Sequence, residues 1–208
     1  EIAQIGSMLA DASGGRPMLD LVGTAIGALP PGRVPIDGSG VRPGDVIIGL
    51  ASSGPHSNGY SLIRMVLAFS GALFEQQLDG RALIELLMEP TRIYVKSLLK
   101  LLEQVPVHAF AHITGGGLTE NIPRVVPEDL GVTLEAKSWP RPAIFQWLMQ
   151  EGSIPEAEMY RTFNMGIGMV ACVAEADAER VLELLKASGE QAWRVGRVES
   201  GVNGVVIR

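Results

Sequence analysis

The sequence predicts an α/β fold (α+β in stricter schemes) in which helices cover both faces of a mixed β-sheet, giving three α/β/α layers. Three observations predict it. Strand-like and helix-like segments alternate along the chain. The strand-like runs at residues 46–50 and 167–174 are apolar on both faces, which is typical of the middle of a covered sheet. The 208 residues are 47% apolar and 19% charged, which is enough to bury a sizeable core.

The first elements set a pattern of strand, loop and helix. An apolar run over residues 19–29 predicts a strand that stops at Pro30-Pro31-Gly32. Pro43 and Gly44 take the central positions of a turn before the strand at 46–50. A loop over residues 51–59 then leads into an amphipathic helix that starts at Tyr60.

The middle of the chain repeats this pattern. Helices are predicted over 82–88 and 91–103, and the second is expected to bury Tyr94, Val95, Leu98, Leu99 and Leu102. Residues 107–113 alternate as a strand and lead through Thr114 and three glycines into a helix over 118–126. The remaining predicted elements are a strand at 132–135, helices at 142–150 and 156–163, a strand at 167–174, a helix at 176–188 that stops at Gly189, and short strands around 193–198 and 205–207.

Composition excludes several functional classes. The formal net charge is −6, and no Lys/Arg run forms a nucleic-acid surface. The longest stretch without polar side chains, residues 165–174, is shorter than the roughly 18 residues of a membrane span. The single cysteine, Cys172, is expected to be a small core side chain in a cytoplasmic protein. Because the net charge is negative, an anionic ligand must be held by backbone donors or a few placed cations.

The segment from Ser52 to Gly59 is the most unusual in the chain. Eight consecutive small, polar or turn-forming residues lie between a buried strand and a helix, which places N–H groups and hydroxyls at a helix N-terminus. His56 is a candidate to donate to a phosphate or to transfer a proton. An ordinary turn in which Ser57 or Asn58 caps the helix explains the same residues equally well.

Thr114-Gly115-Gly116-Gly117 is the second candidate phosphate loop, because glycines let a backbone approach a ligand closely. The triplet matches neither the P-loop nor the dinucleotide fingerprint, and alone it favours a flexible connection. Two strand-to-helix loops in one sheet are more informative, because the ends of neighbouring strands can converge on one crevice.

Two other polar groups have structural explanations. His108 and His112 would lie about 13 Å apart on a strand, too far to share a metal ion. Arg161 and Asn164 end a helix just before a buried strand, where the helix dipole alone explains the arginine.

Four segments together resemble the family of phosphoribosylformylglycinamidine cyclo-ligases, also called aminoimidazole ribonucleotide synthetases. The resemblance follows family order from about residue 19 to residue 198. Its segments are residues 44–62 with the His-Ser-Asn-Gly loop, 89–96 with Pro-Thr-Arg-Ile-Tyr-Val-Lys, 112–118 with 120–124 around the glycine triplet, and 159–164 with Met-Tyr-Arg-Thr-Phe-Asn.

The resemblance implies an ATP-dependent ligase of purine biosynthesis that closes formylglycinamidine ribonucleotide to aminoimidazole ribonucleotide and releases ADP and phosphate. ATP phosphorylates the formamide oxygen, an internal nitrogen attacks, and phosphate leaves. In the family, an N-terminal domain holds most residues for ATP and Mg²⁺ and pairs the subunits of a homodimer.

The resemblance also divides the chain. Residues 1–18 are expected to be a remnant of the interdomain junction, where Glu1-Ile2-Ala3 is similar to a family Glu-Thr-Ala motif, and residues 19–208 are the C-terminal synthetase domain. Because the N-terminal ATP-binding domain is not in this sequence, we expect the 208-residue chain to fold alone and to have no activity.

Residue by residue, the resemblance implies that both loops face the interdomain cleft and hold the substrate's ribose phosphate or the transferred phosphate. His56 is the candidate catalytic residue, Arg161 and Asn164 are secondary candidates, and no metal ligand is expected. The candidate binding residues are Ser53, Gly54, Ser57, Asn58, Gly59, Thr114, Gly115, Gly116 and Gly117.

Two alternatives stay open. One is another ATP-using member of the same superfamily, such as formylglycinamidine ribonucleotide synthetase, selenophosphate synthetase or thiamine phosphate kinase. The other is a noncatalytic ligand-binding domain that keeps the fold without turnover.

Overall fold

The computed structural model describes residues 23–208, of which residues 36–208 form one compact unit and residues 23–35 belong to another. The core of the compact unit is a six-stranded sheet of order β4-β6-β1-β7-β5-β8. β5 and β8 pair in parallel and the other pairs are antiparallel, so the sheet is mixed, as predicted. The strands are β1 (Val46–Ala51), β4 (Ala109–His112), β5 (Leu130–Leu134), β6 (Ile167–Val173), β7 (Ala192–Ser200) and β8 (Val205–Ile207).

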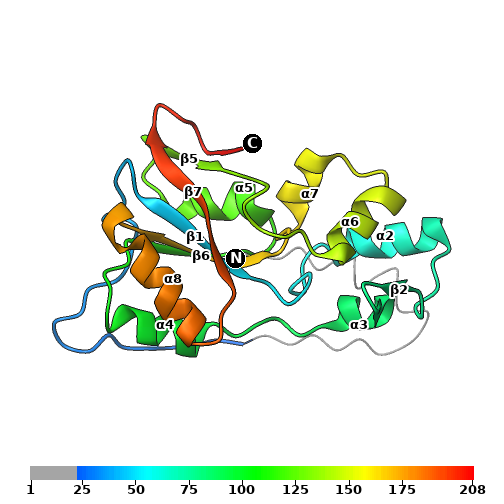
Figure 1. Ribbon diagram of the computed structural model, residues 1–208, viewed down its shortest axis with the longest axis horizontal. Coiled ribbons are helices and arrows are strands. Elements are labelled where there is room, and N and C mark those ends of the chain that lie inside the picture. The colour runs from blue at the N-terminus through cyan, green and yellow to red at the C-terminus, as the bar shows by residue number, and fades with distance from the viewer. Residues whose placement is uncertain (1–22) are drawn as a thin grey trace. The chain divides into compact units, whose positions relative to one another are not determined.

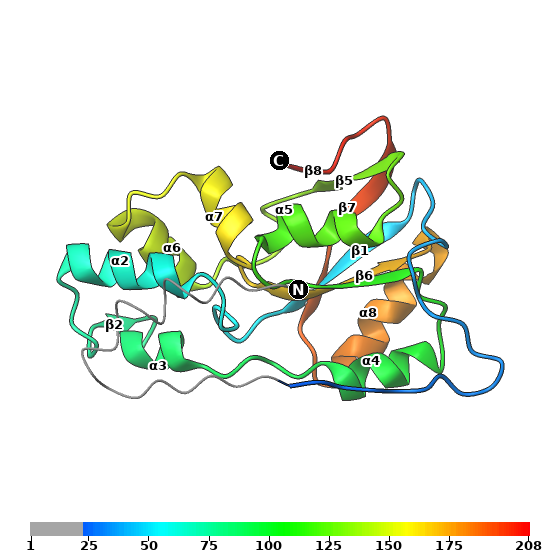
Figure 2. The ribbon, with the colours of Figure 1, turned by 180° about the vertical axis from the view of Figure 1, so that it is seen from behind.

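Helices cover both faces of this sheet (Figures 1 and 2). α4 (Val95–Leu102) and α8 (Ala178–Ala187), the latter preceded by a 3-10 turn at Glu175–Asp177, lie side by side on one face. Against the other face pack α5 (Gly117–Asn121) and the 3-10 turn Ile122–Val125. The same second core includes α2 (Tyr60–Ser70), α3 (Leu83–Met88), α6 (Ala143–Glu151) and α7 (Glu156–Thr162).

Alternation along β1 explains why two separate cores form. Val46, Ile48 and Leu50 point into the α4–α8 core, whereas Ile47 points into the core on the opposite face. All six residues of β1 are buried, so this strand lies in the covered middle of the sheet. The predicted three-layer α/β/α arrangement is confirmed.

One predicted strand is wrong and one hairpin was not foreseen. Residues 23–29 have no strand structure, and residues 19–22 lie outside the described residues. A strand exists only when a neighbour pairs with it, and no strand within residues 23–208 pairs with this run. The predicted turn after it is present, with Arg33 N–H donating to Pro30 O at 3.1 Å. β2 (Gln77–Leu78) and β3 (Arg81–Ala82) form the additional hairpin, too short to show periodicity.

α4 starts later than predicted, and of the residues expected on its buried face Tyr94, Leu98 and Leu102 do pack into the core whereas Val95 and Leu99 do not. Val95 and Leu99 are 58% and 57% exposed, whereas Ser97 and Leu101 are buried. Residues 91–94 are not helical, and α4 then packs against α8, so its contact face is set by that neighbour. Ser97 is tolerated there because its hydroxyl donates to Glu190 Oε1 at 2.7 Å.

The longest apolar stretch supplies β6, and no helix among residues 23–208 combines the length and hydropathy needed to cross a membrane. Cys172 on β6 is a buried free thiol, as predicted. Burial raises the pKa of the Cys172 thiol far above its usual range, with Asp45 adding to the effect. A thiol kept protonated in this way is a poor nucleophile.

Candidate functional site

Two loops meet at one edge of the sheet because of how β1, β4 and β6 pair. β1 and β4 both run antiparallel to β6, which lies between them, so β1 and β4 point the same way and end at the same edge. The His-Ser-Asn-Gly loop (residues 52–59) follows β1, and the glycine loop (residues 114–117) follows β4. A Cβ placed on Gly115 would lie 3.8 Å from Asn58 Oδ1, so the two loops are in contact range.

A third segment, residues 159–166, locks both loops in place. Asn164 is 2% exposed and donates from Nδ2 to Gly54 O at 2.8 Å. Its Oδ1 accepts from Ser52 Oγ and from the Gly166 N–H, each at 2.9 Å. Asn164 is therefore a buried amide whose oxygen and nitrogen both bond to the protein and hold the His-Ser-Asn-Gly loop, rather than a side chain free to reach a ligand.

Glycine is required where this third segment touches the loops. A Cβ on Gly59 would lie 2.3 Å from the Phe163 ring. A Cβ on Gly117 would lie 2.1 Å from Tyr160 O and 2.8 Å from Phe163 O. Both glycines also have positive φ, of 73° and 56°, which L side chains rarely adopt.

His56 lies inside the His-Ser-Asn-Gly loop and is only 3% exposed. Its Nε2 faces the Ser53 N–H and Ser53 Oγ, both at 3.0 Å, and the Arg92 N–H at 3.3 Å. Burial, with smaller contributions from the neighbouring His112 and Arg92, lowers the pKa of His56 to about 4. The imidazole is therefore neutral at pH 7.

The loop backbone around His56 is strained in a way typical of anion-binding loops. His56 and Ser57 both have left-handed φ, at 54° and 60°, which costs about 1 kcal/mol or more per residue for a side chain other than glycine. Asn58 stabilises this shape by donating from its N–H to Pro55 O at 3.2 Å and from Nδ2 to His56 O at 2.7 Å. Ser57 is exposed at the tip. Backbone N–H groups in such turns form concave sites for anions.

The glycine loop is organised by a buried amide, Asn121, which was not among the predicted site residues. Asn121 Nδ2 lies within hydrogen-bond distance of the carbonyls of Thr114, Gly115 and Gly117, at 3.4, 3.1 and 2.8 Å. The Thr114 hydroxyl donates to Asn121 Oδ1 at 3.2 Å. The glycine triplet is thus an ordered turn with its carbonyls tied inward, not a flexible connection. The sequence feature that could have indicated this role is an Asn about one turn into the helix that follows the glycines.

Arg161 lies at the glycine loop but is not directed to the His-Ser-Asn-Gly loop. Its guanidinium is 3.3 Å from Glu120 and 3.5 Å from Glu158, and its side chain is 64% exposed. The Glu120 carboxylate covers the loop, since a Cβ on Gly116 would lie 2.7 Å from Oε2. Arg161 therefore offsets a negative charge beside Gly116.

The strap, residues 90–94, also contacts the His-Ser-Asn-Gly loop and was not predicted as part of the site. Pro90 O accepts from Ser53 Oγ at 2.6 Å, and Tyr94 donates from its hydroxyl to Ala51 O at 2.7 Å. Arg92 is held by Glu190 at 2.9 Å. These contacts join residues 37 or more positions apart, which no local pattern reveals.

Metal ligands are not clustered in the described part of the chain. Among residues 23–208, no group of three or more His, Cys, Asp or Glu side chains is placed to hold a metal ion. Both histidines were predicted to be partly buried and hydrogen-bonded, which is confirmed for His108, paired with Asp45 at 2.7 Å, and wrong for His112, which is exposed at the end of β4.

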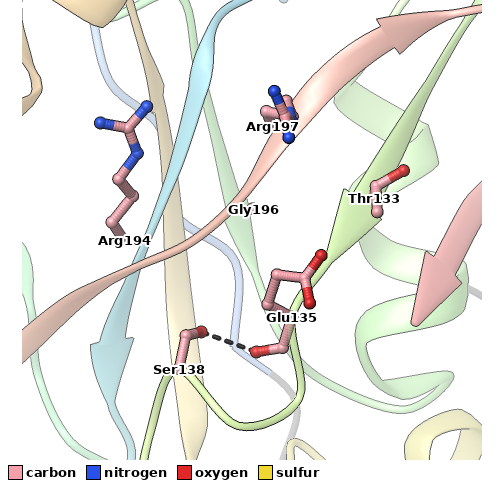
Figure 3. A pocket seen from close by; sticks show the side chains of 6 residues that line it. All are labelled: Thr133, Glu135, Ser138, Arg194, Gly196 and Arg197. Atoms are coloured by element: carbon pink, nitrogen blue, oxygen red, sulfur yellow. Dashed lines mark hydrogen bonds between the residues drawn. The ribbon is translucent and has the colours of Figure 1, made fainter. Parts of the chain in front are cut away.

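A separate pocket of about 260 Å³ lies over β5 and β7 (Figure 3). It is lined by neither loop. Arg194 and Arg197 contribute charge there, but they pair with Glu175 and Glu199, respectively. With both arginines already paired, the pocket has little to attract an anion.

Comparison with known proteins matches this architecture. The sequence profile of the family described as "AIR synthase related protein, C-terminal domain" matches residues 42–208. Thiamine-monophosphate kinase from Stenotrophomonas maltophilia K279a is 18% identical with a TM-score of 0.55, over 82% of this chain and 52% of that chain. The hydrogenase maturation protein HypE in complex with ATP is 20% identical with a TM-score of 0.55, over 82% and 49%. HypE from E. coli is 17% identical with a TM-score of 0.53, over 82% and 47%. The chain spans about half the length of these proteins, with which it shares the fold.

Proposed function

Given that the chain belongs to the family of AIR synthase related proteins, C-terminal domain, we propose that it is the C-terminal domain of an ATP-dependent cyclo-ligase. The reaction converts formylglycinamidine ribonucleotide to aminoimidazole ribonucleotide, ADP and phosphate. The supporting observation is convergence: the four segments that resemble the cyclo-ligases meet around one loop. Residues 90–94 and 164 bond directly to the His-Ser-Asn-Gly loop, and Gly115 lies against Asn58.

In this proposal the loops bind phosphate through the backbone. The His-Ser-Asn-Gly loop presents N–H groups at the N-terminus of α2, where the helix dipole favours an anion. The glycine loop approaches from β4, with Gly115 exposed. Backbone donors suit a protein whose net charge is −6, because its overall field attracts no anion. Arg161 is proposed as an additional phosphate contact when it leaves Glu120.

A reaction that uses ATP and Mg²⁺ also requires residues that bind the divalent cation. ATP supplies the phosphoryl group that activates the formamide oxygen. The described residues offer backbone donors for a phosphate but no cluster of carboxylates for a divalent cation, so the metal ligands are proposed to come from an N-terminal domain. That domain is also proposed to pair two subunits into a homodimer in the cytoplasm.

The second candidate function is that of another ATP-using enzyme of the same superfamily, such as a thiamine phosphate kinase, and the shared fold favours it. Thiamine-monophosphate kinase and HypE with ATP have the same fold as this chain. Because a kinase and a cyclo-ligase can share this fold, the fold does not separate the two candidates. The Pro-Thr-Arg-Ile-Tyr-Val-Lys and Met-Tyr-Arg-Thr-Phe-Asn segments support the cyclo-ligase.

The test uses a longer protein that contains this chain together with the N-terminal domain. Incubated with ATP and Mg²⁺, it is expected to convert formylglycinamidine ribonucleotide and to leave thiamine phosphate unchanged, with ADP and product followed by chromatography. Turnover of thiamine phosphate instead would select the kinase. Binding of neither substrate in calorimetry would select a noncatalytic domain. The 208-residue chain alone is expected to show no cyclisation.

A further inference from the structure

The buried ring of His56 does more than fill space, because it joins two segments that are far apart in the sequence. We propose that His56 is a positioning residue whose Nε2 ties the His-Ser-Asn-Gly loop to the strap and thereby fixes the loop backbone for phosphate binding. This replaces the role of proton transfer to the substrate that the sequence suggested. The benefit to phosphate binding rests on the proposed function, whereas the tie itself does not.

The donors around Nε2 determine the tautomer. The N–H groups of Ser53 and Arg92 are backbone donors that never accept, and both are directed at Nε2. Ser53 Oγ, which gives its own proton to Pro90 O, is the one acceptor facing Nε2; the two backbone donors outweigh it, which assigns the lone pair to Nε2 and the single ring proton to Nδ1. Nδ1 is buried without a hydrogen-bond partner among residues 23–208. It packs against β6, where a Cβ on Gly168 would lie 2.9 Å from it.

A proton-transfer role does not fit this arrangement. A general acid or base needs a ring nitrogen within reach of the ligand. Here the accepting nitrogen is used by the protein itself, and the other faces Gly168 and Tyr94 in the interior. The low pKa of His56 is consistent with a ring that stays neutral.

The strap is a firm anchor for this bond. Arg92 lies 2.9 Å from the buried carboxylate of Glu190, whose other oxygen accepts from Ser97 Oγ at 2.7 Å. Tyr94 donates to Ala51 O, at the end of β1 itself. The strap is thereby tied to α4, to β1 and to the turn after α8 before His56 contacts it. The bond to Arg92 N–H therefore transmits a fixed position to the strained backbone at residues 56–57.

Two substitutions of His56 separate the accepting nitrogen from the backbone strain. A Gln side chain carries its oxygen about as far from Cα as His carries Nε2, so His56→Gln keeps the acceptor. The Asn oxygen is one atom closer to the backbone, so His56→Asn loses it, although Asn adopts the left-handed conformation more readily. If strain were the only issue, Asn would be the better replacement.

The measurements are made by NMR on the 208-residue chain. Nitrogen shifts of the His56 ring are expected to show a bare Nε2 and a protonated Nδ1 throughout pH 5.5–8, and the Ser53 and Arg92 amides are expected to keep their shifts in His56→Gln only. Titration with inorganic phosphate follows the amides of Ser57, Gly59 and Gly115. His56→Gln is expected to bind within about threefold of the unsubstituted chain, and His56→Asn at least about tenfold more weakly.

Three results would overturn the proposal: a protonated Nε2, a ring that titrates near pH 6.5, or amide shifts that Gln and Asn disturb equally. Folding of each variant is checked by thermal unfolding, and a variant that does not fold is replaced by Arg92→Pro, which deletes the donor on the strap side. If phosphate does not bind the unsubstituted chain while the tautomer and amide shifts are as expected, the proposed function fails and the tie stands.

Discussion

The two ends of β1 are built in opposite ways. In the turn before it, Arg42-Pro43-Gly44-Asp45, the positive φ of 92° falls on a glycine, Gly44, and Asp45 N–H donates to Arg42 O at 3.1 Å within the turn. The loop after it places positive φ on His56 and Ser57. Bonds from residues 37 and 112 positions away, at Pro90 and Asn164, hold that loop.

This difference separates a structural end of the strand from the end that is proposed to bind phosphate. The Pro-Gly turn uses residues that prefer its conformation, so its distant contacts to Val198 and His108 do not have to hold a strained backbone. The His-Ser-Asn-Gly loop is held in a conformation that its own residues disfavour by hydrogen bonds to two other segments, the backbone of the strap and the side chain of Asn164. Strain maintained by distant contacts is characteristic of binding sites, which supports the placement of the ligand at this end.

Gly117→Ala is expected to destabilise the chain by roughly 3–5 kcal/mol, because the new Cβ would meet Tyr160 O at 2.1 Å at a positive φ. Denaturant unfolding measures the loss. Gly115→Ala is the matched control in the same loop, where the nearest atom lies at 3.8 Å and no positive φ is required. Equal losses for the two variants would show that the glycine loop is not locked against α7.

Asn164→Ala is expected to cost roughly 2–4 kcal/mol, because it leaves Gly54 O and Gly166 N–H without their partner in a buried site. The loss is measured by the same unfolding experiment. Ser57→Ala, at the exposed loop tip, is the control and is expected to change stability by less than about 0.5 kcal/mol. A small effect at Asn164 would contradict the role of long-range bonds in this loop.

Stability is expected to fall as the pH is lowered because of His56. The folded pKa is about 4 and the unfolded value is 6.5, so between these values the unfolded chain binds the proton and the folded chain does not. The contribution is complete above pH 6.5, and about 2 kcal/mol of it is lost on going from pH 7.5 to pH 5. His56→Gln cannot titrate, so its unfolding free energy should depend less on pH. Parallel pH profiles for the two chains would place His56 in a solvated environment.

Asp45→Asn, at the other end of β1, is expected to cost only about 1 kcal/mol. The amide oxygen can still accept the Arg42 N–H, and the pair with His108 loses its charge. Phosphate binding at the loops is expected to be unchanged, since Asp45 lies at the opposite end of the strand. A binding loss as large as that of His56→Asn would show that the two ends are coupled.

Local pattern was sufficient to predict most elements of the fold. Apolar alternation and helical stripes gave β1, β5, β6, α2, α6 and α8 close to their observed bounds. The errors arise where a neighbouring element determines whether a segment forms a strand or which face of a helix is buried. The run at 23–29 has strand composition but lacks a partner within residues 23–208, and Leu99 on α4 is exposed because α8 contacts a different face.

The two loops of the candidate site were predictable from the sequence, but the residues that hold them in place were not. Gly and small polar residues between a strand and a helix marked both loops from sequence alone. The buried position of His56 depends on the strap folding back onto the loop, and Asn121 acts through carbonyls that only the folded turn presents. Such contacts depend on tertiary structure, so residue type indicated a reactive histidine where packing made a neutral one.

The strand order that brings the loops together also affects how the chain folds. Within this sheet no two strands that are consecutive in sequence lie side by side. Val46 on β1 pairs with Val173 and Arg197, so the central strand gains both neighbours only after nearly the whole chain has left the ribosome. Contacts of such high sequence separation make folding slow, and the apolar β1 remains exposed to aggregation during that time. Production of the domain should therefore depend on synthesis rate and chaperone supply more strongly than its final stability would indicate.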